Sequence, residues 1–597
     1  MSVFRHRRRR SVLVVSVFAA LAAAIAAIAT GTARADANPT AKGPTFSNAN
    51  AFDVSKPLRE LAKLPTGSSS IVVLPDKGHG GIDRSLKKVD DNGLTAASSF
   101  GGVFGTLGLS VASTLATQAN FEGLSNQDNF NLFGFRVNPP DPVGDVGPNH
   151  YVEMVNLAFA VYDKQGNTLL GPADTGTLWA GFAVNDCTDP SGDPVVVYDQ
   201  LADRWILSQF STRGPKYYNC VAVSQTGDPT GSYYRYAFVT QDDPELPGGT
   251  FFPDYPKYSV WTDSYVLTTR DFGDVTGYGI SVYALEKNKM LNGDPKARAV
   301  QFFIDGNVPA NLPLVGDGLL PADVDGMTKP KSSTPIPIVG TQDDDASYGA
   351  TFDAINIFEL TVQWNSIPTA SFGLKTQLPV ASFDSIFPCG VVSGSLAPSS
   401  RDCLPQPGIT NGSRYLDILS YRQRPTYRLA YRSSKAYETM VTSQSVEAAA
   451  GVAGMRWYEI RRNNASGSYS VYQQGTYNPG DGIHRWMGSI AQDKKGNMGL
   501  GYSVVNGVDV FPGIRYTGRL AGDALGTMGS VGEGIIISGT GVQRTTNSRW
   551  GDYSSMNVDP VDDCTFWYVN EYYTAAGQAS SPAGWQTRIA SFKLPGC

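Results

Sequence analysis

The chain has 597 residues, a formal net charge of −6 and only 17% charged residues, against about 25% in an average soluble protein. Beyond the run from Arg7 to Arg10 it has no basic cluster, which excludes the electrostatic footprint of a nucleic-acid-binding protein. The 64 Gly, 37 Pro and 11% aromatic residues are typical of an all-β fold, in which tight turns join many short strands.

The first 35 residues are expected to form a signal peptide. Arg5 and the run from Arg7 to Arg10 form a basic segment, which an Ala-rich apolar stretch follows. Small residues precede Asp36, so we expect cleavage after Ala35 and a secreted, periplasmic or cell-surface protein. The general secretory and twin-arginine routes both stay open. No other stretch reaches the roughly 20 apolar residues of a bilayer span, so no further membrane contact is expected.

Residues 36–119 differ from the rest of the chain. Their tract "LTAASSFGGVFGTLGLSVASTLATQ" has few charges and much Gly, Ser and Ala. This composition predicts a poorly structured N-terminal extension or linker rather than a packed domain.

From residue 120 to Cys597, an Asp beside small residues or Pro recurs next to a short apolar strand and a turn. The units repeat at intervals of 48 to 94 residues, which are too irregular for a solenoid of units of about 20–50 residues. They fit sheets of four short strands that close into a ring without free edges. We therefore predict a seven-bladed β-propeller over residues 120–597. The repeated positions are Asp145, Asp193, Asp254, Asp323, Asp417 and Asp552, with His484 and Arg485 in place of the Asp in the sixth unit.

The six cysteines contain no C-x-x-C pair, and the chain has only four His, so a zinc cluster is not expected. Six cysteines allow 15 pairings, and proximity along the chain favours one of them. The predicted pairs are Cys187–Cys220, Cys389–Cys403 and Cys564–Cys597, at separations of 33, 14 and 33 residues. Disulfides suit an oxidising compartment, and we expect the last pair to hold the final blade closed.

The repeated Asp residues are the candidate ligand-binding set, together with His484 and Arg485. If each Asp begins an inner strand, the carboxylates line one axial funnel. Carboxylates this close repel one another unless a cation compensates, so Ca²⁺ is a candidate ligand and no other cofactor is indicated. The alternative is that each Asp stabilises a turn by accepting backbone N–H groups.

Four stretches resemble a known group: "PPDPVGDVGPNHYVEMVN", "FPDYPKYSV", "HRWMGSIAQDKKGN" and "RWGDYSSMNVDPVDDCTFWYVNEYY". They are similar to secreted bacterial proteins with sialidase-like or BNR-type propellers, over about residues 121–597. The resemblance implies that the protein binds an extracellular glycan or another cell-surface polymer at its funnel. We also expect a monomer. A glycoside hydrolase that uses two funnel carboxylates and an adhesion or scaffold module without a small-molecule site both stay open.

Overall fold

The structure is a computed structural model. It describes residues 41–62, 87–89, 115–242, 249–273, 277–344, 348–385, 402–410, 412–418, 423–545 and 549–597. The predicted signal peptide, most of the predicted extension and Cys389 lie outside these ranges. The chain divides into two compact units, Met1–Asn38 and Pro39–Cys597, and every described residue belongs to the second unit. None of the helices in the described ranges is long and apolar enough to cross a membrane.

Antiparallel sheets of four consecutive strands recur along the chain, which confirms the all-β fold. The first contains β6 (Val143–Val146), β7 (His150–Val155), β8 (Ala158–Asp163) and β9 (Thr168–Asp174). The second contains β10 (Val195–Asp199), β11 (Arg204–Phe210), β12 (Tyr218–Ser224) and β13 (Tyr233–Val239). The third contains β14 (Phe252–Val260), β15 (Ser264–Phe272), β16 (Tyr278–Glu286) and β17 (Arg298–Asp305).

The next two sets join into one eight-stranded sheet, because β18 and β24 pair in parallel. They are β18 (Leu320–Val324), β19 (Ile336–Gln342), β20 (Ala354–Gln363) and β21 (Thr369–Pro379), then β24 (Thr426–Ser433), β25 (Tyr437–Ala449), β26 (Val452–Asn463) and β27 (Tyr469–Tyr477). A further sheet contains β28 (His484–Gln492), β29 (Met498–Val505), β30 (Gly513–Arg519) and β31 (Glu533–Ile537).

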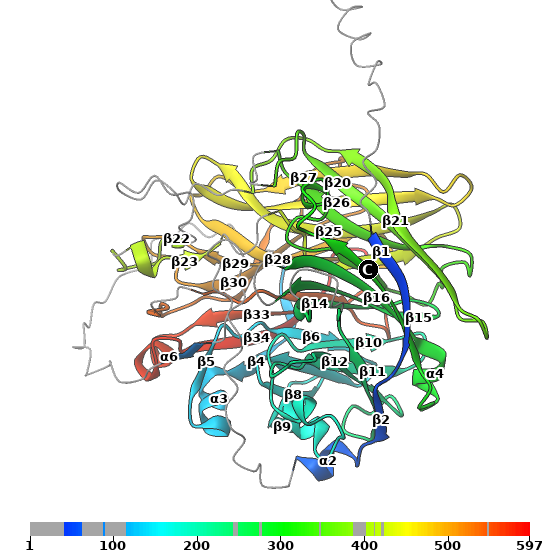
Figure 1. Ribbon diagram of the computed structural model, residues 1–597. Coiled ribbons are helices and arrows are strands. Elements are labelled where there is room, and N and C mark those ends of the chain that lie inside the picture. Colours follow the sequence, from blue (N-terminus) through cyan, green and yellow to red (C-terminus); the bar gives the residue numbers. More distant parts are fainter. Residues whose placement is uncertain are drawn as a thin grey trace, which may run out of the picture. The chain divides into compact units, whose positions relative to one another are not determined.

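The last sheet combines two distant parts of the chain. Its strands are β32 (Ser555–Val558), β33 (Phe566–Tyr573), β34 (Trp585–Phe592) and β4 (Thr117–Ser125), and β4 pairs with β34. Figure 1 shows the red strands β33 and β34 next to β4. The first strands of successive sets contact one another in chain order, from β6 through β10, β14, β18, β24 and β28 to β32, and β32 contacts β6 again.

Two strands near the start of the predicted extension join the edges of sheets. β1 (Ala41–Asn48) pairs with β17, and β2 (Ala51–Val54) pairs with β13; Figure 1 shows β1 in blue beside green strands. Residues 41–54 are therefore structured, which the expectation of a poorly structured extension did not foresee. The physical reason is that they cover two sheet edges that would otherwise present unpaired backbone groups.

The remaining elements are short. They are the helices α2 (Leu58–Leu61), α3 (Asn126–Phe133), α4 (Lys287–Leu291), α5 (Leu312–Val315) and α6 (Ala575–Ser580), the 3₁₀ turns at Thr175–Trp179, Asn185–Thr188 and Gly412–Arg414, and the strand pairs β3 (Lys87–Val89) with β5 (Arg136–Asn138) and β22 (Asp402–Leu404) with β23 (Leu416–Asp417).

Two of the three predicted disulfides are confirmed, Cys187–Cys220 and Cys564–Cys597. The predicted Cys389–Cys403 pair lies outside the described residues. Both observed bridges fit a protein of an oxidising compartment. Each closes a stretch of 33 residues. The first encloses β10 and β11, and the second encloses β33 and β34.

Candidate functional site

The sequence-predicted set divides among several places. Asp193, Asp254 and Asp552 lie at the starts of first strands, whereas Asp145 and Asp323 lie near the ends of β6 and β18. Asp417 lies in the short strand β23, and His484 and Arg485 begin β28. The carboxylates therefore do not all lie at the same end of the first strands.

Asp145 and Asp323 link neighbouring first strands. Asp145 accepts a hydrogen bond from the backbone N–H of Tyr198 in β10 at 2.7 Å. Asp323 accepts one from the backbone N–H of Val260 in β14 at 2.8 Å, and its other oxygen accepts from Arg428 Nε at 2.7 Å. Burial raises the pKa of Asp145 to about 8, although Arg428 opposes the shift. Both carboxylates thus have the backbone partners of a structural Asp.

A second group of side chains lies at the starts of the first strands, and we call it the strand-start cluster. Its members are Asp141, Asp193, Asp254, Tyr255, Lys257, Arg424, Arg549, Asp552 and Tyr553. Each charged member is at most 8% exposed, although charged groups are seldom so buried unless they are paired.

Asp552 joins three parts of this cluster. Its backbone N–H donates to Oδ1 of Asp141 at 2.5 Å, and its Oδ2 accepts from Arg549 Nη2 at 2.7 Å. Its Oδ1 lies 3.5 Å from Arg424 Nη2. Arg549 Nε also lies 3.6 Å from Oδ2 of Asp417, which brings that predicted residue to the edge of the cluster. Residues from four separate segments therefore meet around one pair of arginines.

Lys257 occupies the other side of the cluster. Its ammonium lies 2.7 Å from the ring centroid of Tyr255 and 3.8 Å from that of Tyr553, which are cation–π contacts. The Tyr553 hydroxyl donates to Asp193 Oδ2 at 3.2 Å. Burial holds the pKa of Lys257 well below its usual value, and nearby Arg424 lowers it further.

Burial and mutual repulsion favour protonated carboxyl groups here. Burial raises the pKa of Asp141 to about 7, with a further contribution from the neighbouring Asp552. Burial also raises the pKa of Asp193 well above its usual value, and Asp141 and Asp254 add to the shift. The cluster can therefore hold or release protons near neutral pH.

Proline fixes the chain where it enters these strands. Asp141, Asp193 and Arg424 each lie two residues before a first strand, and each directly precedes a proline. Asp141 and Asp193 have positive φ angles of 50° and 46°, a conformation that disfavours non-glycine residues by about 1–2 kcal/mol. Asn156 holds both turns, because its Nδ2 donates to Asp141 Oδ2 at 2.7 Å and its Oδ1 accepts from the Asp193 N–H at 2.8 Å.

His484 and Arg485 have partners outside the cluster. His484 Nδ1 accepts from the backbone N–H of Ala453 at 3.2 Å, and burial lowers the pKa of His484 to about 4. Arg485 forms ion pairs with Asp481 and Glu533, each at 2.8 Å. These partners belong to β26, to the loop before β28 and to β31, so they do not include the repeated Asp residues.

The structure brings three carboxylates within 4.8 Å of one another at Asp343, Asp344 and Asp353. Among the described residues, no such group forms at the predicted Asp positions. Asp353 Oδ1 and Oδ2 accept backbone N–H groups of Asp344 and Phe383, which accounts for its position without an ion. Calcium binding at the predicted positions stays a prediction.

Sequence reasoning missed Asp141, Lys257, Arg424 and the two tyrosines. The available signal was the residue–proline pair ahead of an apolar strand, as in Asp141-Pro142 and Arg424-Pro425. Because the search followed Asp alone, it selected Asp145 in the first unit and Asp417 in the fifth.

No family model matches the chain, and no curated protein does. Solved structures similar to it include the endosialidase of phage phi92, with 7% identity, coverage of 67% of this chain and 66% of that chain, and a TM-score of 0.34. A subtype N10 neuraminidase-like protein of A/little yellow-shouldered bat/Guatemala has 10% identity, coverage of 68% and 99%, and a TM-score of 0.30. A Cellvibrio cellulosa α-L-arabinanase mutant has 10% identity, coverage of 65% and 93%, and a TM-score of 0.27.

Proposed function

We propose that the protein is a seven-bladed β-propeller that binds carbohydrate at the strand-start cluster. The four-stranded sets, with β4 completing the last, support seven blades. The cyclic contacts of their first strands, from β6 to β32 and back, support closure into a ring. In such a ring the first strands are innermost, so their starts surround one mouth of the axial channel.

The observation that carries the proposal is the convergence of buried, oppositely charged groups at these strand starts. Lys257, Arg424 and Arg549 lie among four carboxylates that come from different sheets. Packing alone favours apolar residues here, since an ion pair removed from water gains little stability over a hydrophobic replacement. Strongly shifted pKa values and strained turns at one location are typical of binding and catalytic sites.

The composition of the cluster favours a polyhydroxylated ligand. The arginines supply fixed hydrogen-bond donors, the carboxylates supply acceptors, and Tyr255 and Tyr553 add aromatic faces. Sugar hydroxyls donate and accept at once, so they match a site in which both kinds of group alternate. A purely acidic funnel would instead favour a cation.

A glycoside hydrolase is the second candidate. Burial raises the pKa of Asp141 to about 7, the range that a general acid needs at neutral pH. Its neighbour Asp552 is paired with Arg549 at 2.7 Å, so the two carboxyl groups lie in different environments, as an acid and its partner require.

Glycan-array binding followed by calorimetry on the strongest glycan tests the proposal. Tyr553→Phe removes one hydroxyl, Asp193→Asn removes one carboxylate, and each should weaken binding at least tenfold while thermal unfolding stays cooperative. Glu60→Gln is the matched control, because Glu60 is exposed on α2. Unchanged affinity in both cluster variants would rule out this site.

Chromatography of the bound glycan after incubation separates the two candidates. Release of shorter products that Asp141→Asn abolishes would establish the hydrolase. An intact glycan would establish binding alone, and the absence of any glycan ligand would favour the scaffold.

A further inference from the structure

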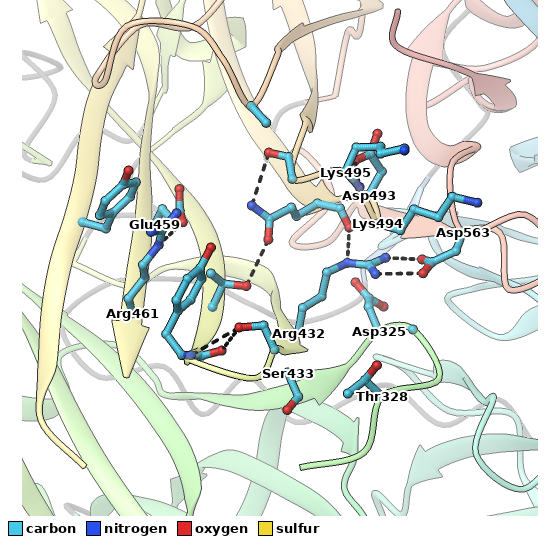
Figure 2. Close-up of a pocket in the computed structure, with 18 of the residues that line it drawn as sticks. Asp325, Thr328, Arg432, Ser433, Glu459, Arg461, Asp493, Lys494, Lys495 and Asp563 are labelled. Carbon is cyan, nitrogen blue, oxygen red and sulfur yellow. Dashed lines mark hydrogen bonds and ion pairs between the residues drawn. The ribbon is translucent and has the colours of Figure 1, made fainter. Parts of the chain in front are cut away.

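A second site lies at the other ends of the first strands. A cavity of about 380 Å³ is lined by residues 325–328, 432–434 and 492–496 and by Asp563, with side chains of β26 and β27 along one wall. Figure 2 shows this cavity, which we call the charged pocket. Its lining segments follow or end β18, β24, β28 and β32, whereas the strand-start cluster precedes or begins first strands. Strands of four to nine residues separate the two by about 13–30 Å.

Two carboxylates of the charged pocket are held by arginines of the protein. Asp563 accepts from Arg432 Nη1 at 3.1 Å and Nη2 at 2.5 Å, as the paired dashed lines of Figure 2 show. Asp325 accepts from Arg428 Nη1 at 3.1 Å and Nη2 at 2.5 Å. These two-point contacts are the strongest form of the Arg–carboxylate pair, so neither carboxylate is available to a cationic ligand.

Three cations of the same pocket contact no carboxylate among the described residues. Lys494 Nζ donates to the backbone carbonyl of Asp562 at 2.7 Å, and Arg519 Nε donates to that of Thr527 at 3.0 Å. The Lys495 side chain is exposed and has no hydrogen bond or ion pair within the described part of the chain. Asp493 also lines the pocket and forms no ion pair among the described residues, and its oxygens accept from the N–H groups of Lys495 and Asn497. Three cations against this one carboxylate leave the pocket with an excess of positive charge.

Neutral hydrogen-bonding groups complete the lining. Thr328, Ser433 and Tyr437 contribute hydroxyls. On the left of Figure 2, Arg461 is held by Glu459 at 2.6 Å, and its guanidinium lies over the Tyr472 ring at 3.2 Å. Tyr472 is itself 40% exposed. The pocket thus offers hydroxyl partners and an accessible aromatic edge beside its unpaired cations.

We propose that the charged pocket binds an acidic saccharide, with the ligand carboxylate at Lys494 and Lys495. The excess positive charge selects an anion, and the hydroxyl-rich lining selects a ligand with several hydroxyl groups. The volume falls in the range of about 300–1,000 Å³ typical of small-ligand sites. This site is separate from the strand-start cluster and does not depend on the function proposed there.

The test compares D-glucuronate with D-glucose, which differ by one carboxylate, as ligands of the full chain in ligand-observed NMR titrations. Wild-type protein should bind glucuronate at least tenfold more tightly than glucose. Lys494→Ala/Lys495→Ala should abolish most of this preference, and raised salt should weaken it. Lys56→Ala/Lys296→Ala, two exposed lysines of other parts of the fold, is the control with the same charge loss and should keep the preference.

Three results would overturn the assignment. They are equal affinity for both sugars, no detectable glucuronate binding, or a preference that survives the Lys494/Lys495 double substitution. Asp193→Asn distinguishes this proposal from the earlier one, because it changes the strand-start cluster alone. Loss of glucuronate binding in Asp193→Asn, but not in the double variant, would move the acidic sugar to the cluster.

Discussion

Removing the Cys564–Cys597 bridge should lower the free energy of unfolding by about 4 kcal/mol. The bridge closes 33 residues that contain β33 and β34. In the chain-entropy model, the loss of a closed loop of this length restores about 12–13 cal/mol/K to the unfolded chain, from loop closure and the fixed end term together. At 25 °C this corresponds to about 4 kcal/mol. The folded state should persist, because β34 stays paired to both β33 and β4.

The chain supplies its own matched control. Cys187–Cys220 also closes 33 residues, so the same model predicts the same loss for both bridges. Guanidinium titrations should compare Cys564→Ala/Cys597→Ala with Cys187→Ala/Cys220→Ala and with the wild type, all under oxidising conditions. Losses that agree within about 1 kcal/mol would support the entropic account.

A loss below about 1 kcal/mol for the Cys564–Cys597 pair would refute this reasoning. It would mean that pairing with β4 already restrains the last sheet in the unfolded ensemble. A larger loss for the Cys187–Cys220 pair alone would instead reflect core packing, since both of those cysteines are fully buried.

Three other features of the structure lead to measurable expectations. The free energy of unfolding should fall as the pH rises from about 4 to 7, because burial raises the pKa of Asp141 from 3.8 to about 7 and the folded protein holds that proton more tightly than the unfolded chain. In urea titrations at pH 5 and 8, Asp141→Asn should reduce this dependence of stability on pH. An unchanged pH dependence would contradict the assignment to Asp141. Deleting residues 41–54 uncovers the edges of β13 and β17. Size-exclusion chromatography with light scattering should therefore detect self-association of the deletion variant, which the expected monomer lacks. A deletion variant that stays monomeric would show that other features protect these edges. Arg428→Met leaves Asp323 and Asp325 buried without their shared partner. It should lower the free energy of unfolding, measured with denaturant, by about 3–5 kcal/mol. A decrease below about 1 kcal/mol would mean that the two carboxyl groups become protonated and neutral in the variant.

Local features of the fold could be predicted from the sequence. Asp and Gly in "YDKQGNTL" favour a turn, and a turn forms there: Asp163 Oδ1 accepts the backbone N–H groups of Gln165 and Asn167 at 2.9 Å. Trp205 and Trp486 are fully buried, as large hydrophobic side chains within strands usually are. The turn depends on residues a few positions apart, and the burial of the tryptophans depends on side-chain hydrophobicity. A single sequence contains both kinds of information.

Long-range pairing could not be predicted in the same way. Nothing in the composition of residues 41–54 indicates that β1 joins β17 and β2 joins β13, because an edge strand acquires its partner only in the folded chain. The strand-start cluster could not be predicted for the same reason. Lys257 and Arg424 belong to different parts of the fold, and only its closure brings both to Tyr255.

The pairing of β4 with β34 also means that one strand is synthesised long before its partner. Ala119 and Ser591, which hydrogen-bond across this pair, are 472 residues apart. At about 5–20 residues per second, β4 would leave the ribosome roughly 20–100 s before β34 exists. During that interval β4 is an unpaired strand and therefore prone to aggregation. A chaperone that binds the growing chain would protect it most effectively at this segment.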